Sequence, residues 1–249
     1  MNHSSEKIVS RHAEISAVPV RTLAAAVTGS GIIAIYSHMK RFLILFVTIV
    51  LCSFTASAQE KSPRILFFGD SITAGYGIEE KNAYPALIQQ KIDSLNWNYQ
   101  VINGGLSGET SAGGLRRIDW MLRQSVSVFV LELGGNDGLR GIDLEVTKSN
   151  LQKIIDKVQD QYPEAVVILA GMQVPPNLGA DYTGEFRQMY PDLAEKNNVE
   201  LIPFLLEGVG GNEALNQSDG IHPTAEGHKI IAENVWETLE PILREQSTQ

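Results

Sequence analysis

Serine, aspartate and histidine side chains occur in two loop-like segments that lie far apart in the sequence. Ser71 stands in segment 69–75, directly after an apolar run, and Asp219 and His222 stand in segment 218–223 near the C-terminus. Histidine is suited to take a proton from a serine hydroxyl near neutral pH, because its unperturbed pKa is about 6.5. A carboxylate three residues earlier can fix its tautomer. These residue types predict nucleophilic catalysis if the fold brings the two segments together.

Each segment also has a simpler interpretation. A serine between a strand and a helix often caps the N-terminus of the helix. Asp219 and His222 could bind a metal ion, but the pattern offers no third and fourth ligand, so we expect no metal and no cofactor. His228 is the only other histidine after residue 58 and falls in a helical pattern. We expect it to be solvated or to pack against the body of the protein.

Two glycine-rich segments follow other apolar runs, at 103–110 and 134–138. Glycine lets backbone N–H groups approach a substrate closely, and the side-chain amide of Asn136 can donate a hydrogen bond without carrying a charge. Both properties suit the stabilisation of a transient oxyanion. Taken alone, either segment is also a simple tight turn. The conjunction of four such segments after apolar runs favours a functional site.

The elements that must position these residues alternate between strands and helices. Continuous apolar runs predict strands that are buried on both faces, with two shorter candidates beside them. Residues spaced by three and four predict helices between the strands. This alternation predicts one parallel sheet covered by helices on both faces, with functional segments gathered beyond the carboxyl ends of the strands. The predicted strands are 65–68, 100–102, 128–131, 166–169 and 200–202, and the helical patterns are 84–95, 151–158 and 231–239.

Charge is divided unevenly along the 249 residues, whose formal net charge is −9. Residues 1–58 hold five of the 20 Lys and Arg and two of the 29 Asp and Glu, which leaves residues 59–249 with a net charge of −12. An acidic body of this size repels phosphate backbones, so we expect no nucleic-acid partner. The single cysteine, Cys52, precedes the body, which therefore has no disulfide and no thiolate nucleophile.

The N-terminal part resembles a leader. Met39, Lys40 and Arg41 precede thirteen uncharged residues, and small residues end the segment at Ala58. This pattern predicts a signal peptide over 39–58 that is cleaved after Ala58, while a retained membrane anchor is the alternative. Residues 1–38 are then an upstream extension that is not native, and 59–249 form a single mature domain. We expect a periplasmic or secreted protein with no membrane span after cleavage.

Four sequence blocks together resemble the SGNH (GDSL) hydrolase superfamily. They are Gly-Asp-Ser-Ile-Thr from residue 69, Ser-Gly-Glu-Thr from 107, Gly-Gly-Asn-Asp from 134 and Asp-Gly-Ile-His-Pro from 219. The stretch 131–141 is similar to the bacterial periplasmic branch of arylesterases, thioesterases and lysophospholipases. The resemblance covers about residues 64–241. It implies a single-domain, flavodoxin-like three-layer α/β/α sandwich with a mainly parallel five-stranded sheet.

The resemblance also assigns roles to individual residues. It implies that Ser71 is the nucleophile, His222 the base and Asp219 its orienting carboxylate. The backbone N–H groups of Ser71 and Gly108 and the side-chain amide of Asn136 match the oxyanion hole. Glu109 departs from the usual pattern, which has aspartate there, and the extra methylene is expected to have little consequence for the chemistry.

The expected reaction is hydrolysis of carboxylic esters or thioesters through an acyl-enzyme, by a monomer that acts on a small-molecule or lipid ester. A carbohydrate acetyl esterase and a non-catalytic exported module that binds acyl groups or glycans are the alternatives. Two long loops, 172–181 and 203–218, are candidates to contact the acyl group, although their apolar residues could simply pack the loops onto the body. The candidate contacts are Met172, Val174, Pro175, Leu178, Phe204, Leu205 and Leu206.

Overall fold

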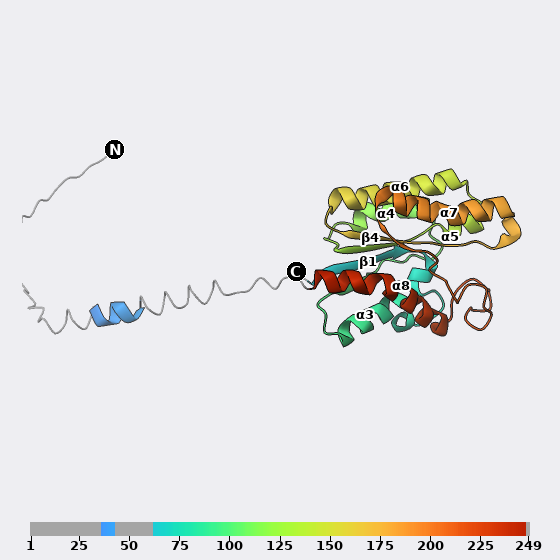
Figure 1. Ribbon diagram of the computed structural model, residues 1–249. Helices are drawn as coiled ribbons and strands as arrows, with labels where there is room; N and C mark the ends of the chain where they lie inside the picture. Colours follow the sequence, from blue (N-terminus) through green and yellow to red (C-terminus); the bar gives the residue numbers. More distant parts are fainter. Residues whose placement is uncertain (1–35, 43–61, 248–249) are drawn as a thin grey trace, which may run out of the picture. The chain divides into compact units, whose positions relative to one another are not determined.

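A computed structural model of the chain describes residues 36–42 and 62–247 (Figure 1). The chain divides into two units, Met1–Glu60 and Lys61–Gln249. In the first unit only residues 36–42 are described, and they form a short helix with exposed side chains. Most of the predicted upstream extension 1–38 and of the predicted signal peptide 39–58, including its cleavage site, lies outside the described residues.

The second unit is built on one sheet of five parallel strands in the order β2-β1-β3-β4-β5. Each strand lies against its neighbours in parallel register, with Leu66 paired to Ile102 on one side and to Phe129 on the other. This confirms the predicted five-stranded sheet. The strands are β1 (Arg64–Gly69), β2 (Gln100–Asn103), β3 (Val128–Glu132), β4 (Val166–Ala170) and β5 (Glu200–Ile202).

Helices cover both faces of this sheet, which confirms the predicted three-layer α/β/α architecture (Figure 1). One layer contains α3 (Tyr84–Ser94) and α8 (Ala225–Gln246). The other contains α4 (Ser111–Met121), α6 (Leu144–Gln161) and α7 (Ala180–Asn197). The short elements are α2 (Ser71–Ala74), α5 (Gly135–Leu139) and the 3-10 turns η1 (Glu80–Asn82) and η2 (Pro176–Leu178).

The core follows from the apolar pattern of these elements. All five residues of β3 and five of the six residues of β1 are buried, as strands covered on both sides require. Every apolar position predicted for 151–158 and 231–239 is buried in α6 and α8. The pattern predicted for 84–95 fails only at Leu95, which caps the C-terminus of α3 and is 44% exposed, because the helix ends at Ser94.

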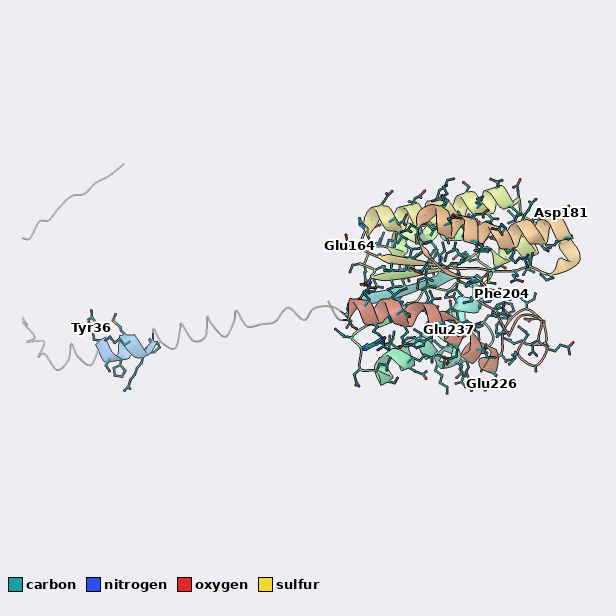
Figure 2. The ribbon with its side chains drawn as sticks, viewed as in Figure 1. Tyr36, Glu164, Asp181, Phe204, Glu226 and Glu237 are labelled. Carbon is teal, nitrogen blue, oxygen red and sulfur yellow. The ribbon has the colours of Figure 1, made fainter. Side chains whose placement is uncertain are left out.

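Within the described ranges 36–42 and 62–247, every helix is too short or too polar to cross a membrane. Many side chains in these ranges, drawn as sticks in Figure 2, belong to the sheet and its two helical layers.

Candidate active site

Ser71 is positioned by the turn from β1 into α2. The side chain of Asp70 accepts a hydrogen bond from the backbone N–H of Ile72 at 3.0 Å, so Asp70, and not Ser71, caps the helix. This frees the serine hydroxyl from the capping role considered above. A Cβ atom at Gly105 would lie 2.2 Å from the backbone nitrogen of Ala74, so only glycine lets the neighbouring loop approach α2 this closely.

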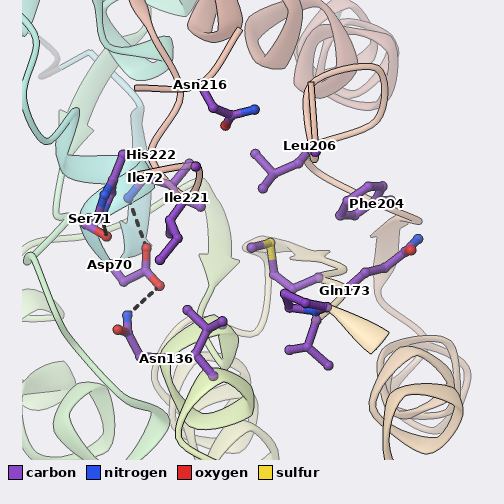
Figure 3. Close-up of a pocket in the computed structure, with 18 residues that line it drawn as sticks. Asp70, Ser71, Ile72, Asn136, Gln173, Phe204, Leu206, Asn216, Ile221 and His222 are labelled. Carbon is purple, nitrogen blue, oxygen red and sulfur yellow. Dashed lines mark hydrogen bonds between the residues drawn. The ribbon is translucent and has the colours of Figure 1, made fainter. Parts of the chain in front are cut away.

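The fold brings Ser71 together with His222 and Asp219. Ser71 Oγ lies 2.9 Å from His222 Nε2, although the two residues are 151 positions apart, and Figure 3 shows them side by side. His222 Nδ1 lies 2.7 Å from Asp219 Oδ2. With its Nδ1 proton donated to this carboxylate, the imidazole presents Nε2 as an acceptor to the serine hydroxyl.

Hydrogen bonds to the carboxylate of Asp219 keep it ionised. Its Oδ1 accepts hydrogen bonds from the backbone N–H groups of His222 at 3.0 Å and Ile221 at 2.9 Å. These two bonds, joined by the contact with the His222 ring, lower the pKa of Asp219 to about 2. The carboxylate therefore remains an acceptor across the neutral range.

Two further residues hold the His222 loop against the Ser71 turn. The side chain of Gln217 donates to the backbone carbonyls of Tyr76 at 2.7 Å and Pro223 at 3.0 Å. The Tyr76 ring lies over the His222 ring, with a centroid separation of 4.5 Å. Sequence reasoning missed both residues, because neither belongs to a block with its own chemistry. Their contacts exist only once the two ends of the chain meet.

Asn136 and Gly108, the other predicted oxyanion-hole residues, follow β3 and β2. Asn136 stands in α5, and its Nδ2 donates to Asp70 Oδ2 at 2.9 Å (Figure 3). Gly108 has a φ of 77°, a conformation in which other residues are strained. Its carbonyl accepts a hydrogen bond from Arg140 at 3.2 Å. Both residues thus reach the carboxyl edge of the sheet at which Ser71 lies.

Arg117 of α4 braces the loop that carries Gly108. Its guanidinium pairs with Glu109, the residue that departs from the usual family pattern, and it donates to the carbonyls of Gly104 at 2.8 Å and Gly69 at 3.2 Å. The same group lies 4.0 Å from the ring centroid of Phe68. One cation therefore ties the end of β1 to the loop after β2.

A cavity of about 450 Å³ opens beside these residues (Figure 3). Five of the candidate acyl contacts line it: Met172, Val174, Pro175, Phe204 and Leu206. Its lining also includes side chains outside the predicted set, among them Ile72, Leu139, Gln173, Asn216 and Ile221.

Two predicted contacts, Leu205 and Leu178, are absent from this lining. Leu205 is fully buried in the core, since its backbone N–H bonds to the Gly171 carbonyl at 2.9 Å and the loop presents Phe204 and Leu206 to the cavity instead. Leu178 ends the turn η2 and is 37% exposed. Neither side chain therefore faces the cavity.

His228, the other histidine in the C-terminal part, lies in the buried interior. His228 is 1% exposed, accepts a hydrogen bond from the backbone N–H of Tyr84 at 3.2 Å and stacks on its ring. It therefore packs and is not solvated, and burial lowers its pKa to about 4.

Among the residues that the structure describes, no group of three His, Cys, Asp or Glu side chains could hold a metal ion.

A serine in hydrogen-bond contact with a histidine that a carboxylate orients, at the carboxyl edge of a parallel sheet, defines the class of serine hydrolases. Residues 67–230 match the GDSL-like Lipase/Acylhydrolase family, and the chain belongs to this family. The expected resemblance to the SGNH (GDSL) superfamily is thereby confirmed, and the chain is an ester-hydrolysing enzyme.

Two relatives align with this chain over nearly their whole length. The chain is 39% identical over 204 residues to Esterase TesA of Pseudomonas aeruginosa, and the aligned region covers 82% of this chain and 100% of that protein. It is 35% identical over 213 residues to Thioesterase 1/protease 1/lysophospholipase L1 of Escherichia coli strain K12, spanning 85% and 99%.

A solved structure shares the fold as well. The psychrotrophic esterase EstA from Pseudoalteromonas sp., in a structure inhibited by monoethylphosphonate, superimposes with a TM-score of 0.69 at 32% identity. The superposition covers 73% of this chain and 98% of that one.

Proposed function

We propose that the chain is an exported serine esterase that cleaves carboxylic esters or thioesters, with Ser71 as nucleophile, His222 as general base and Asp219 as its orienting carboxylate. The observation that carries this proposal is the 2.9 Å contact between Ser71 Oγ and His222 Nε2, with Asp219 at 2.7 Å from the other ring nitrogen. The three groups thus form a chain of hydrogen bonds along which a proton can leave the hydroxyl.

In the first step Ser71 Oγ attacks the acyl carbon while its proton passes to His222 Nε2. The carbonyl oxygen takes the negative charge, and the backbone N–H groups of Ser71 and Gly108 with the amide of Asn136 hold it. Collapse of this intermediate breaks the bond to the leaving alcohol or thiol, which takes the proton from His222. Water then loses a proton to His222 and attacks the acyl-enzyme, and Ser71 regains its proton as the acid departs.

We propose that the acyl chain occupies the cavity beside Ser71. Its apolar contacts from the loop after β4 and from Phe204 and Leu206 suit an alkyl or aryl group better than a sugar. A volume of about 450 Å³ also exceeds what an acetyl group needs. This disfavours the carbohydrate acetyl esterase. An octanoyl ester should be hydrolysed with a higher kcat/KM than the acetyl ester of the same leaving group, and the reverse order would contradict the assignment.

Covalent labelling tests the assignment of the nucleophile. A fluorophosphonate probe should attach to Ser71 in the wild type, as located by mass spectrometry, and Ser71→Ala should lose both labelling and esterase activity while its circular dichroism is retained. Ser94→Ala, which changes an exposed serine at the end of α3, is the matched control and should keep both. Failure to label Ser71 would favour a non-catalytic binding module.

Export and monomeric state complete the proposal. The predicted signal peptide supports export, and N-terminal sequencing of the mature protein should begin at Gln59. A start within residues 1–38 would contradict it. Light scattering after gel filtration should give the mass of a single chain.

A further inference from the structure

Beneath the active-site turn lies a pair of buried carboxyl groups that the proposed mechanism does not use. Asp70 is 2% exposed and Glu132, the last residue of β3, is fully buried. Glu132 Oε2 accepts hydrogen bonds from the backbone N–H of Asp70 at 3.0 Å and from the hydroxyl of Thr73 at 2.8 Å. Its Oε1 is buried with no hydrogen-bond donor beside it. Neither carboxyl forms an ion pair with any described Lys or Arg.

We propose, on the basis of the esterase function above, that Asp70 and Glu132 hold one proton, which resides on Glu132, and that the carboxylate of Asp70 positions the amide of Asn136 for the oxyanion. Asp70 and Glu132 are positioning residues in this account, because they act through Asn136.

The proton is required by the surroundings of the pair. Two adjacent carboxylates without a cation would both lack solvation, so one of them takes up a proton. Burial raises the pKa of Glu132 well above its usual range, and the negative charge of Asp70 raises it further. Burial also raises the pKa of Asp70, to about 6, although hydrogen bonds from Ile72, Glu132 and Asn136 lower it. Protonated Glu132 thus donates to ionised Asp70 at neutral pH.

The titratable groups that face the pair do not change which of the two carboxyls holds the proton. They are Tyr84 on α3, Tyr190 on α7 and His222 on the C-terminal loop. Burial raises the pKa of both tyrosines well above 10, so they stay neutral. The imidazole of His222 is a weaker influence on Asp70 than burial and the three hydrogen bonds.

Asp70 then fixes the direction of both N–H bonds of the Asn136 amide. Its Oδ1 is held by the N–H of Ile72 at 3.0 Å and its Oδ2 receives one N–H of Asn136 at 2.9 Å. Because the amide is planar, fixing one N–H fixes the other, which remains for the oxyanion. A proton on Glu132 also removes a second negative charge from beneath the site where the oxyanion develops, which favours the transition state.

Two isosteric substitutions separate the roles of the pair. In Glu132→Gln the amide donates where the protonated acid donated and accepts where Oε2 accepted, so kcat should stay within about threefold of the wild type. In Asp70→Asn one of the two donors, Ile72 N–H or the Asn136 amide, loses its acceptor, so kcat should fall about 10- to 100-fold with KM little changed. Glu145→Gln, the same exchange on the exposed start of α6, is the control.

Infrared spectroscopy tests the proton directly and without substrate. At neutral pH the wild type should show the carbonyl stretch of a protonated, buried carboxylic acid, and this band should vanish in Glu132→Gln but not in Glu145→Gln. Absence of the band, or a loss of kcat in Glu132→Gln as large as that in Asp70→Asn, would overturn the proposal. Turnover by the wild type and its loss in Ser71→Ala test the esterase function separately from either carboxyl.

Discussion

His228 should make the stability of this enzyme depend on pH in a way that one substitution removes. In the folded protein the buried imidazole of His228 is held in its neutral form, because burial lowers its pKa from 6.5 to about 4. The unfolded chain therefore binds a proton at pH 5 that the folded protein does not. Stability from this residue is fully present above pH 6.5 and is lost as the pH falls toward 4.

The size of the effect follows from the same values. Each pH unit between 6.5 and 4 contributes about 1.4 kcal/mol, so the loss reaches about 2 kcal/mol at pH 5 and about 3 kcal/mol at pH 4. Asp70 acts in the opposite direction, because its pKa of about 6 in the folded state lies above its ordinary value of 3.8. It takes up a proton first in the folded protein and adds stability between pH 6 and 4, so the wild type alone does not isolate His228.

His228→Asn isolates the effect. The asparagine oxygen can accept the hydrogen bond of the Tyr84 N–H in place of the ring nitrogen, but it does not titrate. Urea unfolding at pH 7, 6 and 5 gives the free energy of unfolding of both proteins, and Asp70 cancels in their difference. That difference should shrink by about 2 kcal/mol from pH 7 to 5. A constant difference would refute the reasoning. Esterase activity at pH 7 should persist in the variant, since His228 lies outside the site.

Three further changes test the site and its frame. Asn136→Ala should lower kcat about 10²- to 10³-fold, as expected for loss of one oxyanion donor, and an unchanged kcat in ester hydrolysis would exclude that role. Arg117→Ala leaves buried Glu109 and the Gly104 carbonyl without their cation and should lower the free energy of unfolding by about 3 kcal/mol, measured in urea; Arg123→Ala is the exposed control. Gly105→Ala should yield little folded protein by circular dichroism, because its methyl group would lie 2.2 Å from a backbone nitrogen.

Much of the site was accessible from sequence because its parts sit at the ends of buried strands. Ser71 follows β1 and Asn136 follows β3, and parallel strands bring their carboxyl ends to one edge. His222 could be predicted by elimination, since only two histidines follow residue 58. Periodicity and position were sufficient for Ser71 and Asn136, because each directly follows a buried strand.

Residues that depend on contacts between distant segments escaped prediction. Which face of the loop 203–206 lines the cavity is decided by the bond from Leu205 to Gly171, which no local pattern encodes. Glu132 ends an apolar strand. Its carboxyl is placed by the hydrogen bond from Thr73 and by the space beside it that Gly69 leaves free. Gln217 reaches Tyr76 across 141 positions. Tertiary structure alone creates these relations.

The separation of 151 positions between Ser71 and His222 has a consequence during biosynthesis. A growing polypeptide that has been synthesised only as far as residue 221 already contains the hydroxyl and the five strands of the sheet, yet it lacks the imidazole that we propose activates the hydroxyl. The segment that carries His222 leads directly into α8, which begins at Ala225. On the proposed mechanism, a product that terminates before residue 222 should therefore be inert toward esters.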